Sequence, residues 1–241
     1  MAGEYVVGGR SVAAGRGWDW IASGWELFKK QAGMWIALLV VFLIVMVLLA
    51  VVPILGTLAS TVLTPVFSAG LFVAAKAVDE GRSLEFGQLF AGFREPFIKL
   101  VVVGAIYLGI ALVIALVVGF ATGVSFLAIG AGTAMPEVAT LSAAITLALA
   151  VLIMLALLVP VLMAIWFAPP LVAFHGRGAI EAMQESFLGC LKNVVPFLVY
   201  GVLIMLFGIL AAIPLGLGWL VLGPVLAASA YTSYKDIFIA A

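Results

Sequence analysis

The chain has 241 residues, 66% of them hydrophobic and only 9% charged, and its formal net charge at pH 7 is zero. Soluble domains are roughly half apolar and a quarter charged, so a soluble protein of this composition would lack the polar side chains to cover its surface. The composition predicts a membrane protein, and the zero net charge gives no indication of nucleic-acid binding. The single cysteine, Cys190, and the single histidine, His175, exclude an internal disulfide and a multi-cysteine or multi-histidine metal site, and we expect no cofactor.

Residues 1–13 carry no helical pattern and predict a loose tail. They also lack the basic start and apolar run of a cleaved signal, so we expect the N-terminus to be retained. From residue 17 to residue 30, apolar side chains recur on one helical face with charged residues opposite. The apolar positions are Trp18, Ile21, Ala22, Trp25 and Phe28. The pattern favours an amphipathic helix among lipid headgroups, with a soluble helix that docks on a partner as the alternative.

Two long apolar stretches follow and predict a helical hairpin across the membrane. The first runs from Met34 to Val52, which is long enough to cross a hydrocarbon core of about 30 Å. Pro53 and Gly56 break it, and residues 55–78 return across the membrane. Because the turn is so short, the two helices must be antiparallel neighbours.

A second amphipathic segment and a second hairpin come next. Ser83 is a suitable N-cap, and the residues after it place Phe86, Leu89, Phe90 and Phe93 on one helical face. Pro96 ends or kinks this segment, and spans of about 98–126 and 141–167 follow. The connection between these spans contains Gly130, Gly132, Pro136 and Glu137.

A third amphipathic segment and hairpin complete the chain. Pro169 and Pro170 close the fourth span, and His175 in the loop that follows is expected to be a titrating surface residue. The next segment predicts two helical faces, with Ile180, Met183, Phe187, Cys190 and Leu191 on the apolar one and Glu181, Gln184, Glu185 and Lys192 on the polar one. Cys190 is expected to be a small buried residue. Spans of about 194–213 and 217–234 follow.

The phrase Leu-x-Pro-Val-Phe/Leu-x-Ala occurs three times, around Pro65, Pro160 and Pro224, each time in the returning helix of a hairpin. The repeating unit is therefore an amphipathic interfacial helix, an outward span, a turn and a returning span with a proline. We predict an all-α integral membrane protein of one domain, residues 1–241. Its six transmembrane helices form three hairpins, each preceded by a cytoplasmic amphipathic interfacial helix. The units cover approximately residues 17–78, 83–168 and 179–236, in a pseudo-threefold arrangement.

The basic residues predict the orientation of the chain. All eleven fall on one side of a six-span arrangement, and the opposite side carries Glu137 as its one charged residue. The positive-inside rule then places both termini and the three amphipathic helices in the cytoplasm.

The predicted spans favour a protein without enzymatic activity. Their interiors lack the ionisable side chains that membrane enzymes and proton-coupled carriers use, and no common catalytic motif occurs in the loops. Pro65, Pro160 and Pro224 each free a helical carbonyl group, and small residues around them allow helices to approach closely. The prolines therefore predict either three kinked helices packed around a common axis or a central cavity for a lipid or an apolar molecule.

The C-terminal half resembles a known membrane domain. Residues 182–187 read Ala-Met-Gln-Glu-Ser-Phe, and they are followed by Lys192-Asn193, then Pro224-Val225, then residues 231–238. This sequence pattern resembles the membrane domain attached to some glycerophosphodiester phosphodiesterases, and it also resembles related stand-alone bacterial inner-membrane proteins. Residues 15–21 with Gly24-Trp25 look like an uncharacterised proteobacterial six-span family. The resemblance implies a bacterial inner-membrane protein of unknown activity, with no catalytic residue to transfer.

We therefore expect a protein that acts through contacts, with membrane lipid or another integral membrane protein as partner, or a second copy of itself, and with no nucleic acid. Its cytoplasmic amphipathic helices would make these contacts through Trp18, Trp25, Phe28, Phe86, Phe90, Phe93 and Phe187. The alternative is a carrier or flippase-like protein for an apolar or amphipathic solute, with its pocket at the proline kinks.

Overall fold

The computed structural model describes residues 3–130 and 136–240 and confirms, for these residues, an all-helical chain with one isolated antiparallel bridge between Tyr5 and Ile239. Gly132 of the predicted connection lies outside the described residues. The helices in chain order are α1 (Arg16–Lys30), α2 (Ala32–Ala50), α3 (Leu55–Asp79), α4 (Phe86–Leu89), η1 (Ala91–Phe93), α5 (Phe97–Gly130), α6 (Pro136–Trp166), α7 (Ala168–His175), α8 (Ala179–Lys192), α9 (Val194–Ala212) and α10 (Trp219–Phe238).

Five helical segments of the described residues are long and apolar enough to cross a membrane. They are Ala32–Ala50, Leu55–Asp79, Phe97–Phe120, Leu141–His175 and Val194–Ala212. The sixth predicted span corresponds to α10, which is as long as α9 but more polar. Its C-terminal half carries hydroxyl side chains and the pair Lys235-Asp236, so its average hydropathy is lower than that of the other five.

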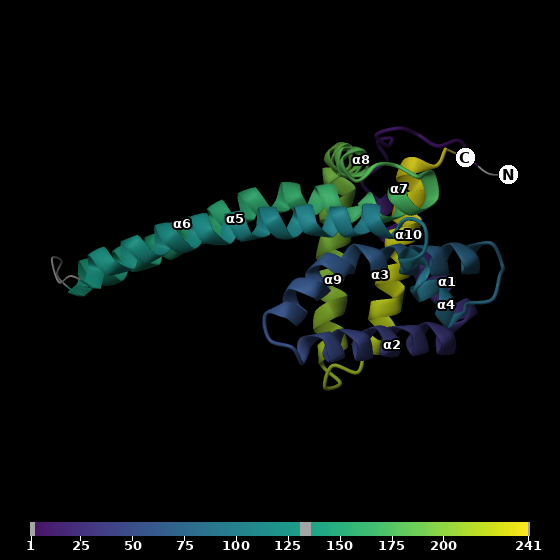
Figure 1. The fold of residues 1–241 in the computed structure, drawn as a ribbon, viewed down its shortest axis with the longest axis horizontal. Coiled ribbons are helices and arrows are strands. Elements are labelled where there is room, and N and C mark those ends of the chain that lie inside the picture. The colour runs from purple at the N-terminus through teal and green to yellow at the C-terminus, as the bar shows by residue number, and fades with distance from the viewer. Residues whose placement is uncertain (1–2, 131–135, 241) are drawn as a thin grey trace.

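Three pairs of consecutive long helices contact each other, α2 with α3, α5 with α6 and α9 with α10, and we call each pair a hairpin. Figure 1 shows the α5–α6 hairpin projecting from the rest of the molecule, crosswise to α9 and α10, with both termini at the other end. Within the α5–α6 and α9 segments, most apolar side chains face outward, as expected for helices whose solvent is lipid.

Each amphipathic segment packs against the hairpin of a neighbouring unit. The short helices α4 and η1 pack on α3, and α8 packs on α6 and α5, so each follows the hairpin that it covers. The first segment, α1, has no preceding hairpin and packs instead on α10 and α9 at the end of the chain. The N-terminal helix thus closes the arrangement by joining the last hairpin.

The expectation of a loose N-terminal tail is wrong for residues 3–13. Their backbone pairs with the C-terminus, with Val6 N donating to Phe238 O at 2.8 Å and Arg10 N donating to Ile237 O at 2.9 Å. Asn193, fully buried after α8, donates to Arg10 O and accepts from Val12 N, both at 2.8 Å. Residues 3–12, which we call the N-terminal strap, therefore lie fixed across α8 and the end of α10.

The predicted end of the fourth span needs a correction at its last turn. Pro169 and Pro170 do not close α6, which already ends at Trp166; they lie in the first turn of α7, where proline is tolerated because its missing N–H has no helical acceptor. A side chain of α8 occupies the break. Ser186 Oγ donates to Met163 O at 2.6 Å and accepts from Phe167 N at 2.9 Å, so it stands between a carbonyl and an amide that would otherwise pair in a helix.

Candidate functional site

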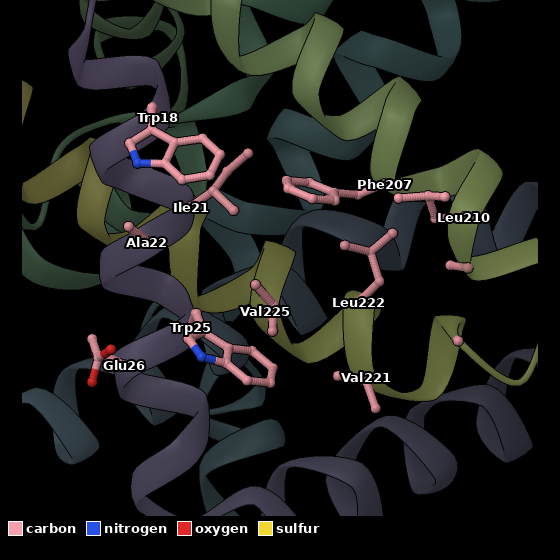
Figure 2. Close-up of a pocket in the computed structure, with 12 residues that line it drawn as sticks. Trp18, Ile21, Ala22, Trp25, Glu26, Phe207, Leu210, Val221, Leu222 and Val225 are labelled. Atoms are coloured by element: carbon pink, nitrogen blue, oxygen red, sulfur yellow. The ribbon is translucent and has the colours of Figure 1, made fainter.

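An apolar groove of about 530 Å³ lies along α1 where it faces α9 and α10. Figure 2 shows Trp18, Ile21 and Trp25 of α1 on one side of it, with Phe207 of α9 and Leu222 and Val225 of α10 opposite. Glu26, at its margin, is the one charged residue in the lining. A cavity of this size and lining suits an apolar chain rather than a polar ligand.

The two tryptophans at this groove remain accessible. Trp18 is 52% exposed and Trp25 is 42% exposed, whereas Ile21 and Phe28 of the same helix are buried. The inward face of α1 is thus turned slightly from the predicted one: it centres on Trp20, which is 1% exposed. Trp18 and Trp25 lie on the flank of that face, where indole rings with an apolar body and a polar N–H suit the boundary between lipid and water.

The other predicted aromatic residues occupy similar flanks. Phe86, Phe90 and Phe93 are all exposed, and Phe90 and Phe93 pack edge-on against Phe67 of α3, with ring centroids 6.1 and 5.1 Å away. Phe187 of α8 is half-buried. The structure therefore keeps the seven predicted aromatic positions on three separate segments and does not bring them into one cluster.

The three amphipathic segments place corresponding residues against their hairpins. The three segments can be aligned so that Trp25, Phe93 and Phe187 share one position. The residue before each of them is small and buried: Gly24 in α1, Gly92 in η1 and Ser186 in α8. Gly24 and Gly92 each lie against the carbonyl oxygen of the residue that follows a proline, Val225 and Val66 respectively. The residue three positions earlier in each segment is a buried apolar one: Ile21, Leu89 or Met183.

A second apolar groove occupies the corresponding place on α8. It has a volume of about 290 Å³ and lies between Ile180, Met183 and Phe187 of α8 and Ile106 and Ala164 of the α5–α6 hairpin. These α8 residues are the counterparts of Trp18, Ile21 and Trp25. A third apolar cavity of about 230 Å³ lies between α6, α8 and α9 and includes Trp166 and Cys190. As expected, Cys190 is buried.

The opposite flank of α1 borders a polar basin of about 790 Å³. Asp236, in the last turn of α10, accepts from Arg16 Nε at 2.7 Å and from Trp20 Nε1 at 2.9 Å. Lys235 pairs with Asp79 of α3 at 2.6 Å. Helix α1 therefore separates an apolar groove from a charged basin, and Glu26 borders both cavities.

Glu185 is a buried charge that sequence reasoning placed wrongly. We expected it on the exposed polar face of α8, but it is only 8% exposed. It accepts hydrogen bonds from Tyr5 Oη and from Gly8 N of the N-terminal strap, and it pairs with Arg177 Nε at 3.0 Å. Burial and the bond to Glu185 raise the pKa of Tyr5 to about 12. No periodicity could reveal this role, because the partner of Glu185 is a strap about 180 residues earlier in the chain.

His175 does not lie on the open surface. It ends α7, is half-buried, stacks on the Tyr5 ring at a centroid distance of 3.8 Å, and forms a hydrogen bond of 2.5 Å with Tyr234 Oη. Among the residues that the structure describes, no group of three or more His, Cys, Asp and Glu side chains is placed to hold a metal ion.

The three repeated prolines have unequal surroundings. Pro65 in α3 and Pro224 in α10 are buried, and these two helices pack against each other. Pro160 in α6 is exposed, on the hairpin that projects from the body of the molecule. None of the four cavities described above has any of these prolines in its lining.

The all-helical fold, the apolar spans and the outward-facing side chains define an α-helical integral membrane protein. A probable inner membrane protein of Burkholderia thailandensis is 29% identical to this chain over 206 residues, an alignment that covers 80% of this chain and 73% of the relative. No protein-family model and no solved structure matches the chain. The resemblance to the membrane domain of glycerophosphodiester phosphodiesterases stays a prediction.

Proposed function

We propose that the chain is a six-span bacterial inner-membrane protein without enzymatic activity, which acts by binding membrane lipid at its cytoplasmic amphipathic helices. The groove between α1, α9 and α10 carries this proposal. It is apolar, opens beside two exposed tryptophans, and lies under a helix with charged residues on its other flank. An acyl chain suits such a groove, because all but one of its lining residues are uncharged and most are apolar.

The pairing of the two chain ends supports six spans. The N-terminal strap and the C-terminus are held together by the bridge between Tyr5 and Ile239, so both ends lie on the same side of any membrane that the chain crosses. This pairing supports an even number of crossings, and in the proposal α10 is the sixth span beside the five more apolar segments. The name of the relative from Burkholderia thailandensis favours an inner membrane.

The charge distribution supports cytoplasmic termini. Five of the basic residues lie on the strap, on α1 or on α10: Arg10, Arg16, Lys29, Lys30 and Lys235. A sixth, Lys192 of α8, binds the strap. Basic residues concentrate on the cytoplasmic side of inner-membrane proteins. The three amphipathic segments, the strap and the C-terminus would then form one cytoplasmic layer.

The carrier alternative receives less support from the arrangement of the prolines. It requires a cavity shared by α3, α6 and α10 at their prolines. Pro65 and Pro224 are buried, however, whereas Pro160 is exposed. Lipid contact at the amphipathic helices needs no such cavity. It uses two grooves that occupy corresponding positions on α1 and α8.

Native mass spectrometry of protein extracted together with its own lipids tests the proposal. We expect bound phospholipid on the wild-type protein and a severalfold lower occupancy in Ala22→Phe, because a phenyl ring at this lining position fills the groove. Ala111→Phe is the matched control, since Ala111 is half-buried in α5 and lies outside the groove. Equal occupancy in Ala22→Phe and wild type, or no phospholipid on the wild type, would contradict the proposal.

A further inference from the structure

We infer that the lipid held along α1 is a zwitterionic aminophospholipid, whose ammonium group binds Glu26 and whose phosphate binds Lys29 and Lys30. This inference rests on the proposed function and adds the chemistry of the headgroup. It starts from the position of Glu26, which borders both the apolar groove and the polar basin. A lipid with its chains in the groove brings its headgroup to this boundary.

Most charges of the basin are already paired within the protein. Arg16 and Arg10 both bind Asp236, at 2.7 and 3.4 Å, and Lys235 binds Asp79 at 2.6 Å. These pairs leave little net charge for a ligand. An anionic headgroup would therefore meet a basin whose cations are neutralised, and it would gain less than its charge suggests.

The charge pair at the end of α1 differs from these pairs in its carboxylate: Asp236 and Asp79 are only 9% and 26% exposed, whereas their cationic partners are 41–52% exposed. Glu26 and Lys29 form an exposed pair at 2.8 Å, with the Glu26 side chain 65% and the Lys29 side chain 48% exposed. Among the described residues, Lys30 has no acidic partner within salt-bridge distance, and it lines the basin beside Glu26. One carboxylate and two ammonium groups are thus available where the groove meets the basin, and the helix C-terminus adds partial negative charge that also attracts an ammonium group.

A zwitterionic aminophospholipid matches this set of charges. Its phosphate carries one negative charge for Lys29 and Lys30, and its primary ammonium donates N–H groups to Glu26, making charge-assisted hydrogen bonds. A choline headgroup has the same net charge but no N–H to donate, so it should bind more weakly. A glycerol headgroup brings no cation of its own to Glu26 and places a phosphate beside a carboxylate.

The test uses delipidated full-length protein in detergent and three phospholipids with identical acyl chains and ethanolamine, choline or glycerol headgroups. Native mass spectrometry measures the affinity of each. Because the groups are exposed, we expect the ethanolamine lipid to bind about two- to fivefold tighter than the choline lipid, and Glu26→Gln to remove this difference. Glu95→Gln is the matched control: Glu95 is an exposed carboxylate between η1 and α5, away from both cavities, and should leave the preference unchanged.

The outcomes separate this inference from the proposed function. Equal affinity of the wild type for the three lipids, or tightest binding of the glycerol lipid, overturns the headgroup assignment while the groove still binds lipid. A preference for ethanolamine that survives in Glu26→Gln overturns it as well. If the wild type binds none of the three lipids, or if Ala22→Phe binds all of them as well as the wild type does, the proposed function itself is wrong.

Discussion

Gly24 of α1 lies directly against Val225 of α10: a Cβ atom at residue 24 would come within 2.7 Å of the Val225 carbonyl oxygen. It would also come within 2.7 Å of the backbone nitrogen of Ser229. Both neighbours are backbone atoms of a helix and cannot rotate away. The absence of a side chain at Gly24 therefore sets how closely α1 packs on α10, and with it the width of the groove beside Trp25.

Gly24→Ala should destabilise the protein by about 1–3 kcal/mol, the usual cost of inserting an extra methyl group into a well-packed contact. Thermal unfolding in detergent measures the effect. Gly33→Ala is the control, because a Cβ at Gly33 meets nothing within 4 Å and alanine favours a helix by up to about 1 kcal/mol. If the two variants unfold at the same temperature, α1 and α10 are far enough apart to accommodate a methyl group at residue 24.

The sequence predicts the long helices well because their signals are local. Apolar length and turn residues locate α2, α3 and α9 almost to the residue, since a helix in lipid must satisfy its backbone internally. The strap and Glu185 could not be predicted, because their contacts join residues about 180 positions apart. The rotation of α1 about its axis, which turns Trp20 inward, could not be predicted from the spacing of apolar residues either. A helix with tryptophans on several sides offers more than one apolar face.

Glu185→Gln should release the N-terminal strap. The substitution removes the charge that Arg177 pairs with and weakens the hydrogen bonds from Tyr5 and Gly8, at a cost of about 1–3 kcal/mol for hydrogen bonds to a charged group. A loss of this size corresponds to at least a fivefold rise in the open population of the strap. The rate of trypsin cleavage after Arg10 reports this opening.

Glu4→Gln is the matched control for the strap, because Glu4 is an exposed carboxylate on the same segment and contributes its backbone carbonyl to the pairing with Ala240. Its cleavage rate should equal that of the wild type. Equal cleavage rates in Glu185→Gln and wild type would show that backbone pairing with the C-terminus alone holds the strap.

The strap should also loosen at alkaline pH. Burial and the hydrogen bond to Glu185 raise the pKa of Tyr5 to about 12 from an ordinary value of 10.0. A raised pKa in the folded state means that the contribution of Tyr5 to stability is fully present below pH 10 and is lost as pH rises through about 12. The physical cause is that a tyrosinate would face the Glu185 carboxylate without a proton between them.

The thermal-unfolding midpoint of the wild type in detergent should therefore fall more steeply between pH 10 and pH 12 than that of Tyr5→Phe. The phenylalanine variant keeps the ring that stacks on His175 but has no group to ionise. Parallel curves for the two proteins over this range would mean that folding does not raise the pKa of the Tyr5 hydroxyl.

Ser186→Ala tests the break between α6 and α7. The Ser186 hydroxyl is buried and bonds both Met163 O and Phe167 N, so its removal leaves a carbonyl and an amide without their partner. Each unpaired buried group costs about 1–3 kcal/mol, unless α6 and α7 straighten and pair these two groups directly. Unfolding in detergent measures the effect, and we expect the free energy of unfolding to fall by at least about 1 kcal/mol.

Ser23→Ala is the control for this prediction. Ser23 lies on the exposed side of α1, so its replacement should not lower the free energy of unfolding, because alanine is a better helix former. Equal stability of Ser186→Ala and Ser23→Ala would show that the helix break does not depend on the hydroxyl.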